Sequence, residues 1–283
     1  MGSKRRLPSW LKRKMNLSEF ARAVKKGLRR DKLNTVCEEA RCPNQAECFD
    51  RKTATYLIMG PNCTRSCGFC DVQSGEAGPL DPDEPKRVAH NAKSLGLKHV
   101  VVTSVTRDDL SDGGAKHFAA TINEIRNTCP NATVEVLIPD FGGSIEALKT
   151  VCNAKPDVLN HNIETVRRLT DAVRSKARYK TSLDVLSAAR ELMPAGRVKS
   201  GLMLGLGESM DEVHRAMRDL RAAGVDTLTI GQYMQPSRDA LPVTEYLHPD
   251  HFEYLAHEGE EMGFDKVFAG PLVRSSYRAG ECC

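Results

Sequence analysis

The sequence lacks the long apolar runs that a membrane helix or a secretory leader requires. No run of eighteen apolar residues occurs, so we expect no transmembrane span. Residues 1–6 lead into no apolar leader core, and Arg6 breaks the N-myristoylation pattern. We therefore expect a cytoplasmic protein, or one of an organelle matrix if a transit peptide has been removed.

The sequence also lacks internal repeats of fixed period and low-complexity segments. Its 283 residues are 40% hydrophobic and 28% charged, which is ordinary for a globular enzyme with one large or two small domains. Such a chain is long enough to form a core without disulfide bonds. We expect it to act as a monomer.

The net charge of +4 is unevenly distributed. Residues 1–32 hold twelve lysines and arginines, against only Glu19 and Asp31. This arm, with a short helix expected from the N-cap candidate Ser18 to near Gly27, is either a solvated amphipathic segment or a docking surface for an acidic partner. No interleaved aromatic residues or known binding module accompany the charge, so we expect no nucleic-acid partner.

Ten cysteines are present, and six of them fall within residues 37–70. In a reducing compartment such clustering indicates metal binding or catalysis before disulfides, and thiolates select zinc, copper(I) or iron–sulfur clusters. Residues 37–48 hold one trio between polar spacers and Pro43, so we expect a loop that is ordered mainly by what its thiols bind. Cys129 and Cys152 read as small buried hydrophobes.

Strand-like and helix-like segments alternate from residue 54 onwards. The expected strands are 54–59, 98–105, 132–138, 157–162, 197–204, 225–230 and 265–269. The expected helices are 84–95, 113–127, 144–153, 181–193, 209–223 and 249–262. The strands are rich in Val, Ile and Leu, which indicates a parallel sheet covered by helices.

Six βα units predict an α/β fold, a partial (β/α)6 TIM-like barrel, although periodicity alone also allows a doubly wound open sheet. We divide the chain into three regions. The first, 1–53, is an N-terminal cysteine-rich extension with the basic arm. The second, 54–248, is the barrel core, and the third, 249–283, is a C-terminal extension. Residues after the carboxyl ends of the strands should line one site.

The second trio, Cys63, Cys67 and Cys70, follows the first barrel strand in the form CxxxCxxC. A structural zinc site needs four ligands, whereas three thiolates on a 4Fe-4S cubane leave one iron open to a small molecule. The spacing therefore favours a catalytic cluster over structural zinc or incidental thiols. With Phe69 before the last cysteine, the motif resembles that of the radical S-adenosylmethionine superfamily.

A more specific resemblance follows from the motifs that accompany CxxxCxxC. These are the first trio, Cys37, Cys42 and Cys48, the terminal Arg274-Ser275-Ser276-Tyr277, and the segments 102–110, 160–165, 201–208 and 231–237. Together they resemble the lipoyl synthase family. The resemblance implies that the first trio holds an auxiliary 4Fe-4S cluster whose fourth ligand is Ser276, or Ser275, and that Cys63, Cys67 and Cys70 hold the cluster that binds S-adenosylmethionine.

The family resemblance also implies the reaction and the partners. Two sulfur atoms are inserted at C6 and C8 of an octanoyl-lysine on a lipoyl-carrier domain, of the 2-oxoacid dehydrogenase E2 or glycine-cleavage H protein type. Deoxyadenosyl radicals remove the hydrogens, and the auxiliary cluster is the sacrificial sulfur donor. An electron donor such as ferredoxin or flavodoxin and an iron–sulfur carrier that rebuilds the spent cluster are expected.

Polar residues at the ends of the other strands are candidates for binding S-adenosylmethionine. Thr103 and Ser104 are assigned to the methionine amino group, and Asn162 and Glu164 to the ribose hydroxyls or that amino group. Arg174 and Arg178 are candidates for the carboxylate, although each also fits a surface position. We expect His161 to be packed and hydrogen-bonded.

Two other functions stay open at this point. Another two-cluster radical enzyme, such as a methylthiotransferase, predicts an appended substrate-binding domain. A zinc-stabilised protein whose basic arm grips nucleic acid predicts zinc and steeply salt-dependent binding. The terminal Cys282 and Cys283 fall outside the family pattern and are either adventitious or redox-sensitive.

Overall fold

A computed structural model describes residues 7–12, 18–39 and 42–281. Its sheet has eight strands in sequential order: β1 (Asn34–Thr35), β2 (Thr53–Ile58), β3 (His99–Ser104), β4 (Thr133–Leu137), β5 (Val158–Asn160), β6 (Arg197–Leu204), β7 (Thr227–Gln232) and β8 (Lys266–Gly270). Strands β2 to β8 are parallel, and β1 pairs antiparallel with β2. A doubly wound sheet would reverse its strand order, so the sequential order confirms the partial barrel.

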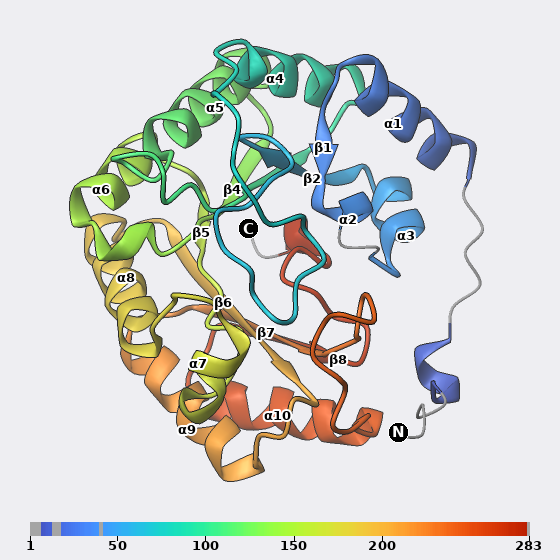
Figure 1. Ribbon diagram of the computed structural model, residues 1–283, viewed down its shortest axis with the longest axis vertical. Helices are drawn as coiled ribbons and strands as arrows, with labels where there is room; N and C mark the ends of the chain where they lie inside the picture. The colour runs from blue at the N-terminus through green and yellow to red at the C-terminus, as the bar shows by residue number, and fades with distance from the viewer. Residues whose placement is uncertain (1–6, 13–17, 40–41, 282–283) are drawn as a thin grey trace.

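Helices cover the outer face of the curved sheet (Figure 1). They are α4 (Glu84–Ser94), α5 (Ala115–Thr128), α6 (Ile145–Asn153), α8 (Tyr179–Leu192), α9 (Met210–Ala222) and α10 (Pro249–Glu261), whereas the short α7 (Thr170–Val173) lies inside this ring. Apart from α7, each of them matches a helix predicted from the sequence to within a few residues. Short 3-10 turns lie at Ser9–Leu11, Phe141–Gly143, Arg167–Leu169 and Ala279–Glu281.

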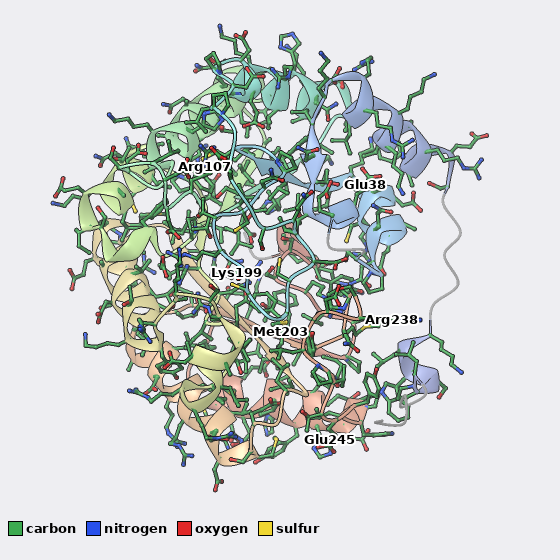
Figure 2. All side chains as sticks on the ribbon, viewed as in Figure 1. Glu38, Arg107, Lys199, Met203, Arg238 and Glu245 are labelled. Carbon is green, nitrogen blue, oxygen red and sulfur yellow. The ribbon has the colours of Figure 1, made fainter. Side chains whose placement is uncertain are left out.

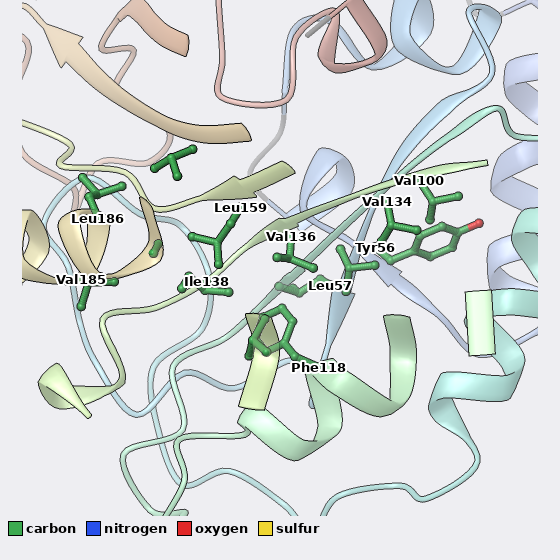
Figure 3. Close-up of a cluster of buried hydrophobic side chains, with 14 of the residues drawn as sticks. Tyr56, Leu57, Val100, Phe118, Val134, Val136, Ile138, Leu159, Val185 and Leu186 are labelled. Atoms are coloured by element: carbon green, nitrogen blue, oxygen red, sulfur yellow. The ribbon is translucent and has the colours of Figure 1, made fainter. Parts of the chain in front are cut away.

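The core lies between the strands and these helices. Figure 3 shows Phe118 of α5 near Val136 of β4, and both side chains are fully buried. Burying each such side chain contributes about 1.5–3 kcal/mol. This packing gives the strand ends a rigid frame, on which loops can hold reactive groups.

The N-terminal region contains the helix expected from Ser18, and this helix is longer than expected. Helix α1 (Glu19–Arg30) begins at the predicted cap Ser18, whose Oγ accepts the Ala21 N–H at 3.0 Å, but it runs three residues past Gly27. Leu28, in this added part of the helix, is completely buried.

Residues 37–48 were predicted to be a loop, and this prediction is wrong. Two helices, α2 (Val36–Glu39) and α3 (Gln45–Asp50), occupy most of that segment. The Thr35 hydroxyl accepts the Glu38 N–H at 3.3 Å, and Phe49 is completely buried. Tertiary burial thus outweighs the local loop signals.

The C-terminal segment after β8 turns back into the molecule (Figure 1). Ala279 is completely buried, and a Cβ at Gly280 would lie 3.4 Å from His99 at the start of β3. Gly231 of β7 makes room for this segment, since a Cβ there would lie only 2.1 Å from the Val273 carbonyl oxygen. Residues 273–280 therefore lie against the inner face of the barrel. No described helix is long and apolar enough to cross a bilayer.

Candidate functional site

The CxxxCxxC loop leaves β2 through a turn that is held by two charged side chains. Met59 and Gly60 both have positive φ, 70° and 91°. The Met59 N–H donates to Glu84 Oε2 at 2.8 Å, and Arg107 Nη1 donates to the Met59 carbonyl at 3.2 Å. An αL conformation is costly for methionine, so these two bonds fix the direction in which the loop leaves the strand.

Neighbouring loops fasten the thiol loop through its backbone. The Cys63 N–H donates to the Gln73 carbonyl at 2.8 Å, and the Gly68 N–H donates to the Val173 carbonyl at 2.9 Å. Two backbone N–H groups, those of Arg65 and Thr106, lie 3.4 and 3.3 Å from Cys63 Sγ. The structure therefore orders this loop from several sides.

Cys37 and Cys48 of the first trio lie on α2 and α3, with Cys42 between these helices, and the C-terminal segment reaches this region. Asn44 Nδ2 donates to the Leu272 carbonyl at 2.6 Å, and the Tyr277 hydroxyl donates to Glu47 Oε1 at 3.0 Å. These bonds join residues that are 228 and 230 positions apart in the chain. They bring the Arg274–Tyr277 motif to the first trio.

One cavity of about 390 Å³ connects the parts that the sequence singled out. It is lined by thiols from both trios and by both candidate serines: Cys37, Cys42, Cys48, Cys70, Ser275 and Ser276. Strands β6 and β7 form its inner wall, and Figure 2 shows Met203 of β6 near the middle of the molecule. The predicted auxiliary site and the predicted radical site therefore face one common space.

Burial raises the pKa of several thiols in these trios. Desolvation, together with the neighbouring Cys42, raises the pKa of Cys37 to about 12, and desolvation with Cys37 raises the pKa of Cys48 to about 12. Desolvation also raises the pKa of Cys70 to about 11 and that of Cys67 above its usual value. Without a cation these thiols hold their protons, and a bound cationic centre would favour the thiolates.

The candidates for S-adenosylmethionine contacts lie at the carboxyl ends of β3 and β5. The Thr103 hydroxyl donates to the Leu137 carbonyl at 2.9 Å, while the buried Ser104 Oγ has no hydrogen-bond partner among the described residues. Asn162 Nδ2 donates to Glu164 Oε1 at 3.0 Å, and both residues line the cavity. The buried Asn162 Oδ1 likewise has no partner in the described part of the chain.

The conformation of Glu164 is unusual. Its φ is +66°, and the residue is held between strands because its N–H donates to the Gly201 carbonyl at 3.0 Å. Desolvation raises the pKa of its carboxyl group, although Arg174 opposes the shift. A carboxyl group kept in a strained, sheltered position beside an unpartnered amide oxygen is suited to binding hydroxyl or amino groups.

The two candidate arginines occupy different environments. Arg174 is buried, and its Nη1 donates to Ser182 Oγ at 2.8 Å and to the Ile163 carbonyl at 3.3 Å. Arg178 is exposed over 70% of its side chain and pairs with Asp171 at 3.1 Å, so the structure does not bring it to the cavity.

His161 is buried between two partners, as the sequence predicted. Its Nδ1 lies 2.9 Å from the Ile138 carbonyl, and its Nε2 lies 3.0 Å from Ser182 Oγ. Burial lowers the pKa of His161 to about 4. The side chain is therefore a neutral packing element that also orients the serine bonded to Arg174.

Residues that pair over long distances were missed by sequence reasoning. Arg65 lies inside the CxxxCxxC motif and forms ion pairs with Asp108 and Asp140, at 2.8 and 2.9 Å. Asp108 follows β3, and Asp140 follows β4. Their position at strand ends was the available signal, but nothing in the sequence indicated the partner.

The remaining cysteines lie away from the cavity or outside the described residues. Cys152 is buried and Cys129 is partly buried, where its Sγ lies 3.8 Å from the Ala89 carbonyl. This agrees with their prediction as small hydrophobes. Cys282 and Cys283 lie outside the described residues.

Comparison with known proteins matches both halves of this site. Residues 57–231 match the radical SAM superfamily, and residues 1–42 match the N-terminal domain of lipoyl synthase of that family. Lipoyl synthase of Symbiobacterium thermophilum is 55% identical over 98% of this chain and 86% of the relative. That of Caldanaerobacter subterraneus subsp. tengcongensis is 54% identical, over 97% and 96%. The chain belongs to the lipoyl synthase family.

Solved structures of lower identity support the fold of this lipoyl synthase family member. HydG, a maturase of the [FeFe]-hydrogenase, aligns with a TM-score of 0.59 at 16% identity, over 89% of this chain and 67% of HydG. Methylornithine synthase aligns with a TM-score of 0.56 at 14% identity, over 87% and 74%. The match to lipoyl synthases over nearly the whole chain sets aside the methylthiotransferase and zinc-protein alternatives.

Lipoyl synthases use S-adenosylmethionine and two 4Fe-4S clusters, and the described residues fit both clusters. No three described His, Cys, Asp or Glu side chains are arranged to hold a single metal ion. Each cysteine of a cubane binds a different iron, so its thiols need not converge on one point. The three soft thiols of the first trio and Cys70 of the second line one cavity, which is compatible with two such cubanes.

Proposed function

We propose that this chain inserts sulfur at C6 and C8 of an octanoyl-lysine on a lipoyl-carrier domain, producing the dihydrolipoyl group. The observation that carries the proposal is the common cavity, which holds thiols of both trios beside the terminal serines. A radical centre and a sulfur source must both reach the same acyl chain. One cavity shared by the radical centre and the sulfur source meets that need.

The proposed ligands are the thiols of the two trios and one terminal serine. Cys63, Cys67 and Cys70 would hold the cluster that binds S-adenosylmethionine. Cys37, Cys42 and Cys48 would hold the auxiliary cluster, with Ser276, or its neighbour Ser275, as the fourth ligand. When bound, the first cluster and S-adenosylmethionine supply the radical that breaks C–H bonds, and the auxiliary cluster supplies the sulfur.

The chain's own side chains bind and orient the cofactor in this proposal. The unpartnered Ser104 Oγ and Asn162 Oδ1 would accept or share hydrogens with its polar groups, beside Thr103 and Glu164. Buried Arg174 would face its carboxylate, because desolvation strengthens that attraction. Exposed Arg178 would be peripheral to the binding site.

The serine ligand and the enclosure of the site have separate proposed roles. An alkoxide is a harder and weaker partner for iron than thiolate, so Ser276 would release its iron when the auxiliary cluster gives up sulfur. The cavity walls would keep water away from the reacting carbon. The contacts of Tyr277 and Asn44 would hold the serine at the trio.

We propose three regions: residues 1–53 and 249–283 supply the auxiliary site, and residues 54–248 supply the radical site. Within residues 249–283, α10 and β8 continue the barrel. The proposed partners are carrier domains, a ferredoxin- or flavodoxin-type electron donor, and an iron–sulfur carrier that rebuilds the auxiliary cluster. We propose a monomer without nucleic-acid partners. Its compartment would be reducing, either cytoplasm or an organelle matrix, because the six ligand thiols must stay reduced.

The test is anaerobic incubation of the reconstituted protein with reductant, S-adenosylmethionine and an octanoyl-lysyl peptide. We expect about eight irons per chain, release of 5′-deoxyadenosine, and a peptide in which two sulfurs replace two hydrogens. Stoichiometric zinc without iron would contradict the proposal. Deoxyadenosine release without sulfur insertion would contradict the role of the auxiliary cluster.

A further inference from the structure

Arg65 lies between the first two cysteines of the CxxxCxxC loop and joins two carboxylates. Its Nε and Nη2 donate to the two oxygens of Asp108 at 2.9 and 2.8 Å. Its Nη1 and Nη2 donate to the two oxygens of Asp140 at 2.9 Å each. A planar guanidinium that is bidentate to two carboxylates is among the stronger polar contacts in proteins.

This contact ties together three consecutive strand-end loops. Arg65 is on the loop after β2, Asp108 is on the loop after β3, and Asp140 follows β4. The side chains of Arg65 and Asp140 are only 8% and 3% exposed, so water does not screen their attraction as it does at a surface pair. Asp140 is itself held, because its Oδ1 accepts the Gly142 N–H at 3.0 Å.

The same loops supply hydrogen bonds to a thiol sulfur. Cys63 Sγ accepts the N–H of Arg65, and it accepts the N–H of Thr106 from the loop that carries Asp108. Thr64 Oγ1 reinforces this arrangement: it donates to the Thr106 carbonyl at 2.9 Å and accepts the Asp108 N–H at 3.0 Å. The guanidinium therefore fixes the positions of the Arg65 and Thr106 N–H groups relative to Cys63 Sγ.

We propose that Arg65 is a positioning residue that orders the thiol loop and, by holding two N–H donors on Cys63 Sγ, raises the reduction potential of the cluster bound there. The inference rests on the proposed function, which places a cluster at this loop. Hydrogen bonds to cluster sulfurs and nearby net charge both set the potential of an iron–sulfur cluster. Loss of the guanidinium would weaken the donors and leave two carboxylates unneutralised, and both changes lower the potential.

The opposite end of the barrel offers a matched control. Arg190 Nη1 donates to Asp226 Oδ2 at 2.7 Å, and the same oxygen accepts the Val198 N–H at 2.8 Å. This pair also joins an arginine to a carboxylate that accepts a backbone N–H. It lies at the amino ends of β6 and β7, so it serves stability and not the thiol loop.

The experiment uses the full chain with Cys37, Cys42 and Cys48 replaced by alanine, so that one cluster remains. In this background Arg65→Gln, Arg65→Lys and Arg190→Gln are compared by potentiometric titration followed by electron paramagnetic resonance, and by thermal unfolding. We expect Arg65→Gln to shift the potential to a more negative value. We expect a smaller shift in Arg65→Lys, which keeps the positive charge but cannot form the bidentate contacts. We expect no shift of the potential in Arg190→Gln, which should lower only the Tm.

Loss of iron from a folded Arg65→Gln chain, with iron retained in Arg65→Lys, would also support the positioning role. An unchanged potential and full iron content in Arg65→Gln would overturn it and leave the proposed function intact. If the triple-alanine background does not fold, the same variants are compared in the otherwise intact chain. There the electron paramagnetic resonance signal that changes when S-adenosylmethionine is added is followed. Absence of any such signal from the unsubstituted chain would instead contradict the proposed function.

Discussion

The two thiol trios are held in different ways. The loop with Cys63, Cys67 and Cys70 is fastened by the barrel itself, through backbone bonds and ion pairs to the loops that follow neighbouring strands. Cys37 and Cys48 of the other trio lie on the short helices α2 and α3, with Cys42 between them. Side chains from that region bond to Leu272 and Tyr277 of the C-terminal segment. One site is therefore built by the sheet, and the other by the meeting of the two chain ends.

This difference fits the proposed roles of the two clusters. A cluster that generates radicals repeatedly needs a fixed surrounding, which the barrel supplies. A cluster that is consumed and rebuilt needs a fourth ligand that can leave and return. Residues 272–281 can supply such a ligand because separate side-chain bonds to Asn44, Glu47 and Arg51 hold the segment beside the trio. The comparison predicts that damage to one trio leaves the cluster of the other trio in place.

The largest effect is expected from Cys67→Ala. Removing one of three thiolates from the radical site should abolish both deoxyadenosine release and sulfur insertion, because every step depends on the radical. Iron should fall to about four per chain, since the auxiliary cluster is retained. Chromatographic assay of deoxyadenosine, with Cys152→Ala as the thiol control, checks this. Deoxyadenosine release at the unsubstituted rate would contradict the assignment.

Cys42→Ala should separate the two functions. The barrel-built site stays intact, so deoxyadenosine release should continue in the presence of the octanoyl peptide, while no sulfur enters it. Mass spectrometry of the peptide and chromatography of the nucleoside from one reaction measure both. Insertion of even one sulfur at the normal yield would show that the first trio is not the donor site.

Ser276→Cys should retain both clusters but impair turnover, because a thiolate holds the iron that an alkoxide would release. Ser275→Cys is the matched control, since both serines line the cavity. Iron analysis and product yield are measured together. Full activity in Ser276→Cys, with loss only in Ser275→Cys, would transfer the role to Ser275.

Tyr277→Phe should loosen the contact between the C-terminal segment and α3. It removes the hydroxyl that donates to Glu47 at 3.0 Å, a change worth about 1 kcal/mol. We expect the auxiliary cluster to lose iron to a chelator several-fold faster, with the radical cluster unaffected. Exposed Tyr254 provides the control Tyr254→Phe. Equal rates of iron loss in both variants would argue against a stabilising role of the Tyr277–Glu47 contact.

The smallest effect is expected from Arg178→Ala. Its exposed pair with Asp171 contributes at most about 1 kcal/mol, and S-adenosylmethionine affinity should stay within about twofold. Arg174→Ala should weaken that affinity at least tenfold, because it removes a buried charge near the site. Calorimetric titration of the reconstituted protein distinguishes them. A reversal of this order would exchange their roles.

The repeating part of the fold was predictable because each barrel strand carries its own pattern. Val100, Val101 and Val102, for example, mark β3 by composition alone. The N-terminal region was not predictable, since Pro43 and polar spacers indicate a loop, whereas burial of Phe49 favours α3. Local sequence pattern determines the secondary structure where burial is uniform along an element. Elsewhere tertiary packing determines it.

The site divides in the same way. The spacing of Cys63, Cys67 and Cys70 identifies the thiols, because ligands to one cluster can be close in sequence. The pairing of Arg65 with Asp108 and Asp140 is invisible in the sequence, since the partners lie 43 and 75 positions away. Buried Arg174 and exposed Arg178 likewise look equivalent until the fold gives them different surroundings.

The central claim is that the trio joined to the chain ends supplies the sulfur. Protein reconstituted with sulfide of a heavy sulfur isotope, then transferred to medium without sulfide, should be given the octanoyl peptide for a single turnover. The account predicts that both inserted sulfurs carry the heavy isotope and that the Cys42→Ala chain yields no product. Light sulfur in the product, or heavy product from Cys42→Ala, would contradict it.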